Sequence, residues 1–280
     1  MKKEQLIPVN VVIISGQSNG VGCSHSDYIS HSMGQEKYDE FLSGYPTIKI
    51  AYDCWTKDWP TPETSICYSQ NASRDYNFVK VQLGQGNYDG SFGPEIGIAE
   101  ELHNKYANKL FLIKYACGAT NLRDDWLGNN PPLYKQMIDY IKLQMNNLAK
   151  QGYYPVIKAF CWMQGEGDAF DGYYQEYLNN QRRFVNDLRK DLYELAGNKP
   201  LPFIDAGISD ASVWERYQQV NEAKKAFSEE NELNIYIDTI KEGLHTHLEP
   251  YNEPDLYHYD SESEVLLGHL FAKAFKKFLD

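Results

Sequence analysis

The sequence is short of the features that mark several common classes of protein. No apolar run is long enough to cross a membrane, and no internal repeat or low-complexity segment occurs. The five cysteines are an odd number and include no Cys-x-x-Cys pair. A disulfide framework or a zinc ribbon is therefore not expected. Free thiols in a reducing compartment are the simplest interpretation of these residues.

Positive charge is also scarce. Lys and Arg number 27 against 39 Asp and Glu, which gives a formal net charge of −12. Such a surface repels phosphate backbones, so nucleic acid is not an expected partner, and the lack of a spanning segment argues against a membrane. The N-terminal apolar run is broken by Pro8 and Asn10, and no small-residue cleavage site follows it. We expect a cytoplasmic location for the chain as given, or secretion if a signal peptide has been removed.

Hydrophobic residues make up 42% of the chain and charged residues 24%, which suits a globular core. Strand-like and helix-like runs alternate, and this order predicts an α/β fold in which helices cover both faces of a mostly parallel sheet. We expect one domain over 1–280, with 53–93 as a long loop insertion because it lacks a clear period. The predicted strands are 11–15, 47–52, 109–116, 154–165, 201–209 and 234–239, and the predicted helices are 93–107, 133–152, 171–196, 211–229 and 261–279.

Ligands of such sheets bind at the carboxyl ends of the strands. The segments that follow the predicted strands include 16–20, 118–121, 164–168 and 209–210. The chain is also rich in tyrosine, with 22 residues. These rings can serve as platforms for sugars or only as packing, and composition alone does not choose between the two.

The segment IISGQSNGVG, residues 13–22, follows the first predicted strand. A phosphate-binding loop needs G-x-x-x-x-G-K-[ST] or G-x-G-x-x-G, and the segment matches neither pattern. The alternative is that it presents Ser18 as a nucleophile on a turn, where a backbone N–H can donate to an oxyanion. A serine in a glycine-flanked turn is more often structural. The nucleophile hypothesis therefore requires a general base elsewhere in the chain.

A candidate base lies in the segment PDLYHYDSESEVLLG near the C-terminus. Asp255 and His258 are three residues apart, just before the last predicted helix. At this spacing the carboxylate can reach the near imidazole nitrogen and fix its tautomer, while the far nitrogen faces Ser18. The spacing alone also occurs by chance, with the aspartate as a cap and the histidine on the surface.

Together the motifs resemble the SGNH-type hydrolases, in the branch of carbohydrate esterase family 6 and the sialate O-acetylesterases. The resemblance implies a three-layer α/β/α fold of the flavodoxin-like kind and a serine esterase that removes O-acetyl groups from a carbohydrate, with no cofactor. Many members of the wider superfamily have G-D-S where this chain has GQSN, so the resemblance is to the carbohydrate branch and not to lipases. The segments that carry it are SGQSN (15–19), FGPEIGIA (92–99), CGATNL (117–122) with WMQGEGD (162–168), and DLYHYDSESEVLLG (255–268).

By position, the resemblance implies that Ser18 is the nucleophile, His258 the general base and acid, and Asp255 the residue that orients the imidazole. The backbone N–H groups of Ser18 and Gly93 would bind the oxyanion. Gln164 would add a third donor in place of the asparagine that many relatives use, because a glutamine also offers an amide NH₂. Water would then clear the acyl-enzyme formed on the serine.

Other polar residues after the strands are candidates for the substrate pocket or for supporting its loops: Gln17, Asn19, Thr120, Asn121 and Glu166. Arg123 could also line a pocket, and Trp126 could stack on a sugar or lie in the core. His245 and His247 lack a clear third ligand, so no metal site is expected. His25 and His31 lie in polar sequence and are predicted to be surface residues.

Three other functions fit some of the same residues. A sugar O-acyltransferase would pass the acetyl group to a sugar hydroxyl, and a non-catalytic carbohydrate-binding protein would be favoured if Ser18 and His258 were too far apart to share a proton. Glu166 and Asp168 suggest a glycosidase, but two carboxylates on one loop lack an opposing group. The sequence leaves the sugar and the oligomeric state open.

Overall fold

A seven-stranded sheet forms the centre of the protein, in the order β4-β3-β6-β1-β7-β8-β9. All of its strands run parallel except β4, which pairs antiparallel with β3 at one edge. The computed structural model describes residues 6–56, 77–128 and 132–280. The sheet comprises β1 Ile7–Gly16, β3 Tyr45–Thr56, β4 Val79–Val81, β6 Leu110–Gly118, β7 Tyr153–Met163, β8 Phe203–Ala206 and β9 Asn234–Ile237, and a separate antiparallel pair is made by β2 Ser24–His25 and β5 Ser91–Phe92.

The apolar composition of β1 explains its central place in the sheet. It pairs with β6 on one side and β7 on the other. Residues 11–16 are all buried, as are all residues of β6. Parallel strands covered on both faces require such continuous apolar runs, because neither face meets water. The carboxyl end of β1, where the chain turns toward Ser18, therefore lies on a rigid support.

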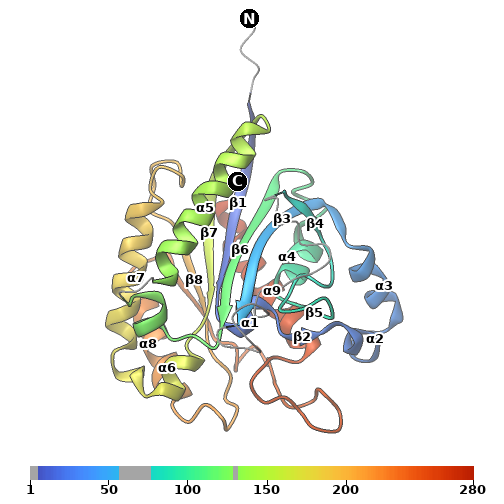
Figure 1. Cartoon of the computed structure of the whole chain (residues 1–280), viewed down its shortest axis with the longest axis vertical. Helices are drawn as coiled ribbons and strands as arrows, with labels where there is room; N and C mark the ends of the chain where they lie inside the picture. The colour runs from blue at the N-terminus through green and yellow to red at the C-terminus, as the bar shows by residue number, and fades with distance from the viewer. Residues whose placement is uncertain (1–5, 57–76, 129–131) are drawn as a thin grey trace, which may run out of the picture.

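Helices cover both faces of the sheet (Figure 1). The long helix α5 lies in front of the sheet in that view and contacts β6 and β7, whereas α9 lies behind it and contacts β7 and β8. Helix α8 packs beside α7, and α4 packs against α9. The helices are α1 Ser18–Val21, α2 Ile29–Ser32, α3 Gln35–Ser43, α4 Glu95–Leu102, α5 Leu133–Lys150, α6 Glu166–Asp171, α7 Tyr177–Asp191, α8 Tyr217–Glu229 and α9 Ser261–Phe275, with a π turn at Leu122–Trp126 and 3₁₀ turns at Ser26–Tyr28, Tyr173–Gln175 and Lys276–Phe278.

Two glycines allow α4 and α9 to approach closely. A Cβ at Gly97 would lie 2.0 Å from the carbonyl oxygen of Val265, and one at Gly268 would lie 2.2 Å from the carbonyl oxygen of Pro94. Both distances are far below van der Waals contact, so a larger residue would force the helices apart. The contact fixes the start of α9, and with it the loop that carries Asp255 and His258.

The three-layer α/β/α fold predicted from the sequence is confirmed, with shifted element boundaries. The helix predicted at 171–196 begins only at Tyr177, because Gly172 adopts a left-handed conformation with φ of 83° and ends α6. The helix predicted at 211–229 begins at Tyr217.

The segment 53–93, predicted to be a long loop, contains strand residues as well as irregular ones among its described residues. Residues 53–56 complete β3, and β4 and β5 also fall within the segment. Residues 57–76 lie outside the described part of the chain.

Candidate active site

A cavity of about 520 Å³ opens beside α1, at the carboxyl ends of the parallel strands. This is the edge at which ligands bind in open α/β sheets. Segments far apart in the sequence meet there, from the turn after β1 to the loop before α9. The lining residues are Gln17, Ser18, Cys23, His25, Thr56, Asn87, Tyr88, Ala119, Trp214, Asp255, Tyr257 and His258.

The turn that carries Ser18 depends on a glycine. Gly16 ends β1 with φ of 141°, and a Cβ there would lie 1.9 Å from the carbonyl oxygen of Met163. Only glycine fits this conformation and this close approach. The chain then enters α1 at Ser18, which is 8% exposed and lines the cavity. Neither the hydroxyl nor the backbone N–H of Ser18 has a hydrogen-bond partner among the described residues.

Asp255 and His258 form a hydrogen-bonded pair in the loop before α9. The imidazole Nδ1 lies 2.6 Å from Asp255 Oδ2. The other carboxylate oxygen accepts the backbone N–H of Tyr257 at 2.9 Å, and the backbone N–H of Asp255 donates to the Glu249 carbonyl at 2.8 Å. With Nδ1 bound to the carboxylate, the imidazole is held in one orientation, so that Nε2 is the nitrogen available for proton transfer.

Asn19 joins the turn that carries Ser18 to the loop that carries His258. Its side-chain oxygen accepts the backbone N–H of Tyr259 at 3.0 Å, and its amide donates to Glu166 Oε1 at 2.9 Å. The residue next to Ser18 is thereby bonded to the residue next to His258. Burial raises the pKa of the Glu166 carboxyl above its ordinary value. Asn19 and Glu166 thus support the loops, one of the two roles considered for them from the sequence.

Hydrogen bonds of two further side chains, Gln17 and Lys114, hold the turn in place. The Gln17 side-chain oxygen accepts the backbone N–H groups of Gly165 and Gly167, each at 3.1 Å, which ties the turn after β1 to the turn after β7. The ammonium group of Lys114, fully buried on β6, donates to the Val21 carbonyl at the end of α1 at 2.9 Å and to Glu95 Oε2 at 2.8 Å. A buried charge requires such a complete set of partners.

The pKa of His258 is set by opposing effects. Burial lowers it, but the Cys23 sulfur and the Asp255 carboxylate together outweigh burial and raise the pKa of His258 well above its ordinary value. For Asp255, burial also opposes the charged form, yet the hydrogen bond and charge of His258 bring the pKa of this carboxyl below its ordinary value. The pair therefore favours a carboxylate facing a readily protonated imidazole.

Two of the predicted oxyanion donors form hydrogen bonds with neighbouring groups of the protein in this structure. The backbone N–H of Gly93 donates to Glu95 Oε1 at 2.9 Å. The Gln164 amide is fully buried and donates to the Thr120 carbonyl at 3.2 Å and to Asp168 Oδ2 at 2.6 Å. Neither residue lines the cavity. Both donors therefore have internal acceptors in this structure, and their role toward a substrate oxygen stays a prediction.

The segment after β6 supports the loops and does not line the cavity, apart from Ala119. The Thr120 hydroxyl donates to the Cys117 carbonyl at 2.7 Å, and the Asn121 amide donates to Asp171 Oδ2 at 2.8 Å. Trp126 is fully buried and packs edge-on against Trp162, with ring centroids 4.9 Å apart. Of the two interpretations of Trp126, the core position is confirmed and the sugar platform is wrong.

With this geometry described, comparison with known proteins identifies the family. The family model described as "Carbohydrate esterase, sialic acid-specific acetylesterase" matches residues 8–277. The chain belongs to this family. It is accordingly a carboxylic ester hydrolase, and the family implies an O-acetylated carbohydrate as the substrate. A comparison with curated protein sequences gives no match.

Solved structures share the fold of this esterase. A protein from Arabidopsis thaliana has a TM-score of 0.68 at 22% identity, over 98% of this chain and 100% of that one. NanS has a TM-score of 0.65 at 16% identity, over 97% of each chain. A carbohydrate acetylesterase from Xanthomonas citri has a TM-score of 0.59 at 14% identity, over 96% of this chain and 56% of that one. At these identities the likeness establishes the fold alone.

Several residues that line the esterase's cavity were not predicted from the sequence. Asn87 and Tyr88 fall in the 53–93 segment, and Trp214 and Tyr257 were not singled out. His25, predicted to be a surface residue, is partly buried and lines the cavity. The glycine-rich stretch around Asn87, which turns back before β5, is the signal that could have drawn attention to this segment.

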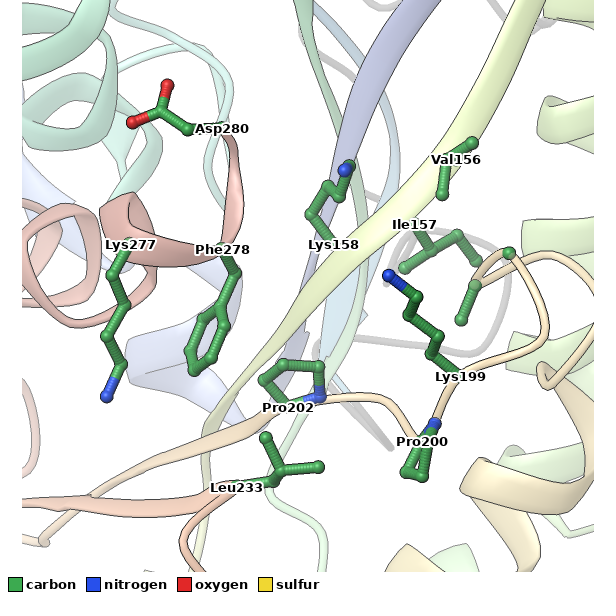
Figure 2. A pocket seen from close by; sticks show the side chains of 12 residues that line it. Val156, Ile157, Lys158, Lys199, Pro200, Pro202, Leu233, Lys277, Phe278 and Asp280 are labelled. Carbon is green, nitrogen blue, oxygen red and sulfur yellow. The ribbon is translucent and has the colours of Figure 1, made fainter.

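A second cavity of the esterase, of about 460 Å³, lies at the amino ends of the strands (Figure 2). Val156 and Lys158 come from the first half of β7, and Pro202 and Leu233 directly precede β8 and β9. Figure 2 shows Lys199 and Lys277 on separate sides of this cavity. It contains no histidine and no cysteine among the described residues.

Two further findings concern metal ions and membranes. Within residues 6–56, 77–128 and 132–280, no group of three or more His, Cys, Asp or Glu side chains is placed to hold a metal ion. His245 lies against Asp260 at 2.5 Å and beside the ring of His247, in a loop. None of the helices in the described part of the chain is both long and apolar enough to span a membrane.

Proposed function

We propose that the esterase removes O-acetyl groups from a carbohydrate through a catalytic triad of Ser18, His258 and Asp255. The observation that carries this proposal is that all three side chains line one cavity although they come from opposite ends of the chain. The 2.6 Å bond between His258 and Asp255 supports the role of the carboxylate in orienting the imidazole. The bond between Asn19 and Tyr259 supports the proximity of the serine to the histidine.

In the first step Ser18 Oγ attacks the acetyl carbonyl carbon while His258 Nε2 takes the hydroxyl proton. The tetrahedral intermediate collapses, the bond to the sugar oxygen breaks, and His258 gives the proton to that oxygen. Water then attacks the acetyl-serine, again with His258 as the base, and acetate leaves. Asp255 stays ionised and stabilises the imidazolium in both halves of the reaction. This fits a carboxyl whose pKa lies below its ordinary value.

For the oxyanion we propose the backbone N–H of Ser18 and the side-chain amide of Asn87. The Thr56 hydroxyl donates to Asn87 Oδ1 at 2.9 Å, which orients the amide. The NH₂ group of Asn87 has no hydrogen-bond partner among the described residues, and Asn87 lines the same cavity as Ser18. Two fixed donors of this kind stabilise the charge that develops on the carbonyl oxygen.

The matched test compares Ser18→Ala with Cys23→Ala, because the cavity holds both a hydroxyl and a thiol near His258. We expect Ser18→Ala to lower kcat for p-nitrophenyl acetate and for acetylated sugars by about 10⁴-fold or more. We expect Cys23→Ala to remain active. Intact-mass spectrometry after a serine-directed organophosphate should find one adduct on the wild type, at Ser18, and none on Ser18→Ala.

The opposite pattern, with activity retained in Ser18→Ala and lost in Cys23→Ala, would assign the nucleophile to the thiol and overturn the proposal. Circular dichroism and thermal unfolding of both variants check that the fold is intact.

A further inference from the structure

Aromatic side chains extend from the cavity toward α6. Tyr257, which lines the cavity beside His258, packs edge-on against Trp214 with ring centroids 5.4 Å apart. Trp214 in turn packs edge-on against Phe170 at 6.4 Å. Trp214 is buried, but Tyr257 is 49% exposed and Phe170 is 70% exposed. We call these three residues the α6 arm.

A second set of rings extends from the cavity toward α2. His25 and Tyr88 line the cavity, with ring centroids 5.9 Å apart and a hydrogen bond between them. His25 packs against Tyr28 at 5.9 Å, and Tyr28 packs edge-on against Tyr251 at 4.8 Å. Tyr251 is 55% exposed. We call His25, Tyr28, Tyr88 and Tyr251 the α2 arm.

The two arms leave the cavity in different directions. Phe170 lies in α6, and Tyr28 directly precedes α2. In Figure 1, α6 lies at the lower left, α2 lies to the right, and α1 with Ser18 lies between them. The elements that carry Phe170 and that follow Tyr28 thus lie on opposite sides of α1 in this view.

Exposed aromatic rings are concentrated at this end of the molecule. Among the exposed aromatic side chains of the described residues, Tyr88, Phe170, Tyr251 and Tyr257 belong to the arms. Only Tyr154 and Tyr193 lie elsewhere, and neither touches the cavity. Single exposed aromatic residues are ordinary, but a connected group of them around a cavity marks a binding surface.

We propose that the two arms are subsites for sugar rings on either side of the acetylated sugar, so that the substrate is an oligosaccharide or polysaccharide chain. One face of a pyranose ring carries mainly C–H groups, which pack on an aromatic ring, while its hydroxyls stay in water. Tyrosine suits such a site because it combines an apolar ring with a polar tip. The proposal rests on the proposed esterase function, since the arms are defined relative to Ser18.

The first test measures how the rate depends on substrate length. Acetate release is followed on chemically O-acetylated β-1,4-linked xylo-oligosaccharides of one, three and six residues, with free O-acetylated sialic acid as a second single-sugar substrate. We expect kcat/KM, calculated per acetyl group, to rise about tenfold or more from one residue to six. A value for either single sugar that equals or exceeds that for the six-residue chain overturns the proposal.

The second test removes one ring from each arm. Phe170→Ala and Tyr251→Ala alter exposed side chains, so the fold should be kept. Each should lower kcat/KM for the six-residue substrate by roughly threefold to tenfold, and the double variant by more. Tyr154→Ala is the matched control, because this ring is 57% exposed but lies at the start of β7, at the opposite end of the sheet.

Hydrolysis of p-nitrophenyl acetate separates the two proposals. This small ester needs the triad but not Phe170 or Tyr251, which do not line the cavity, so Phe170→Ala and Tyr251→Ala should hydrolyse it at the wild-type rate. Loss of this activity in Ser18→Ala tests the triad independently. If neither arm variant changes the rate on the six-residue chain, or if Tyr154→Ala reduces it equally, the arms are not subsites, whatever the result for Ser18.

Discussion

Two cavities of similar size, of about 520 and about 460 Å³, lie at opposite ends of the same parallel strands. At the carboxyl ends, several polar side chains around Ser18 are fixed by hydrogen bonds. Asp255 orients His258, Thr56 orients Asn87, and Asn19 ties the serine turn to the histidine loop. The side chains at this end therefore have defined positions as well as the required chemistry.

The cavity at the amino ends carries charge without such fixing. Lys158, Lys199 and Lys277 line it, and none of them forms an ion pair within the part of the chain that the structure describes. Lys277 lies over the ring of Phe278, 4.9 Å from its centroid. A hydrated ammonium group on a long side chain supplies charge but no fixed geometry. The comparison teaches that polar groups held in place, and not volume, distinguish the proposed active site from the second cavity.

The strongest test of this difference between the cavities is to remove one polar side chain from each of them and to compare the activities. His258→Ala should lower kcat/KM for p-nitrophenyl acetate by about 10⁴-fold or more, since the reaction loses its general base. Lys158→Ala should stay within about twofold of the wild type, within the usual range for a surface substitution. A large loss in Lys158→Ala would show that the amino-end cavity also contributes to the reaction.

A smaller effect is expected at the proposed oxyanion donor. Asn87→Ala should lower kcat by about 10²- to 10³-fold with little change in KM, because a donor of this kind acts mainly in the transition state. Thr56→Val, which removes only the hydroxyl that orients Asn87, should cost less. Steady-state kinetics on p-nitrophenyl acetate measure both. An Asn87→Ala enzyme within threefold of the wild type would contradict the assignment.

The smallest predicted effect is a shift in the pH dependence of kcat/KM. His258 must be neutral to accept the serine proton, so kcat/KM should rise as the pH passes upward through the pKa of His258. Cys23 and Asp255 raise this pKa, so the acid limb should lie above the ordinary range of histidine. Cys23→Ala removes one of these influences and should move the limb to lower pH. Lys277→Ala, at the other cavity, should leave it in place.

The sequence predicted the sheet well because each strand can be recognised from a short local run of residues. Runs such as 11–14 and 110–113, within two of the predicted strands, are continuous and apolar, as buried parallel strands require. Motif resemblance also placed Ser18, Asp255 and His258 in one cavity, although 237 positions of sequence separate Ser18 from Asp255. Whether they react together remains a prediction that the variants above test.

The donors of the oxyanion hole were harder to predict. Gly93 and Gln164 stand at the expected positions, but Glu95 and Asp168 accept their hydrogen bonds, and sequence does not reveal which partner a buried donor will find. Asn87, the donor that we propose, was not singled out from the sequence. It lies in a stretch without periodicity and reaches the cavity through the pairing of β2 with β5.

The bond from Asn19 to the backbone of Tyr259 joins positions 240 residues apart. During synthesis the ribosome releases the nucleophile turn long before the segment to which it must bind. A nascent chain can form most of the sheet, but the serine has no imidazole beside it until the last loop has emerged and α9 has docked. Partial translation products that lack α9 and the loop before it are therefore expected to be inert toward esters, because the proposed triad cannot form without them.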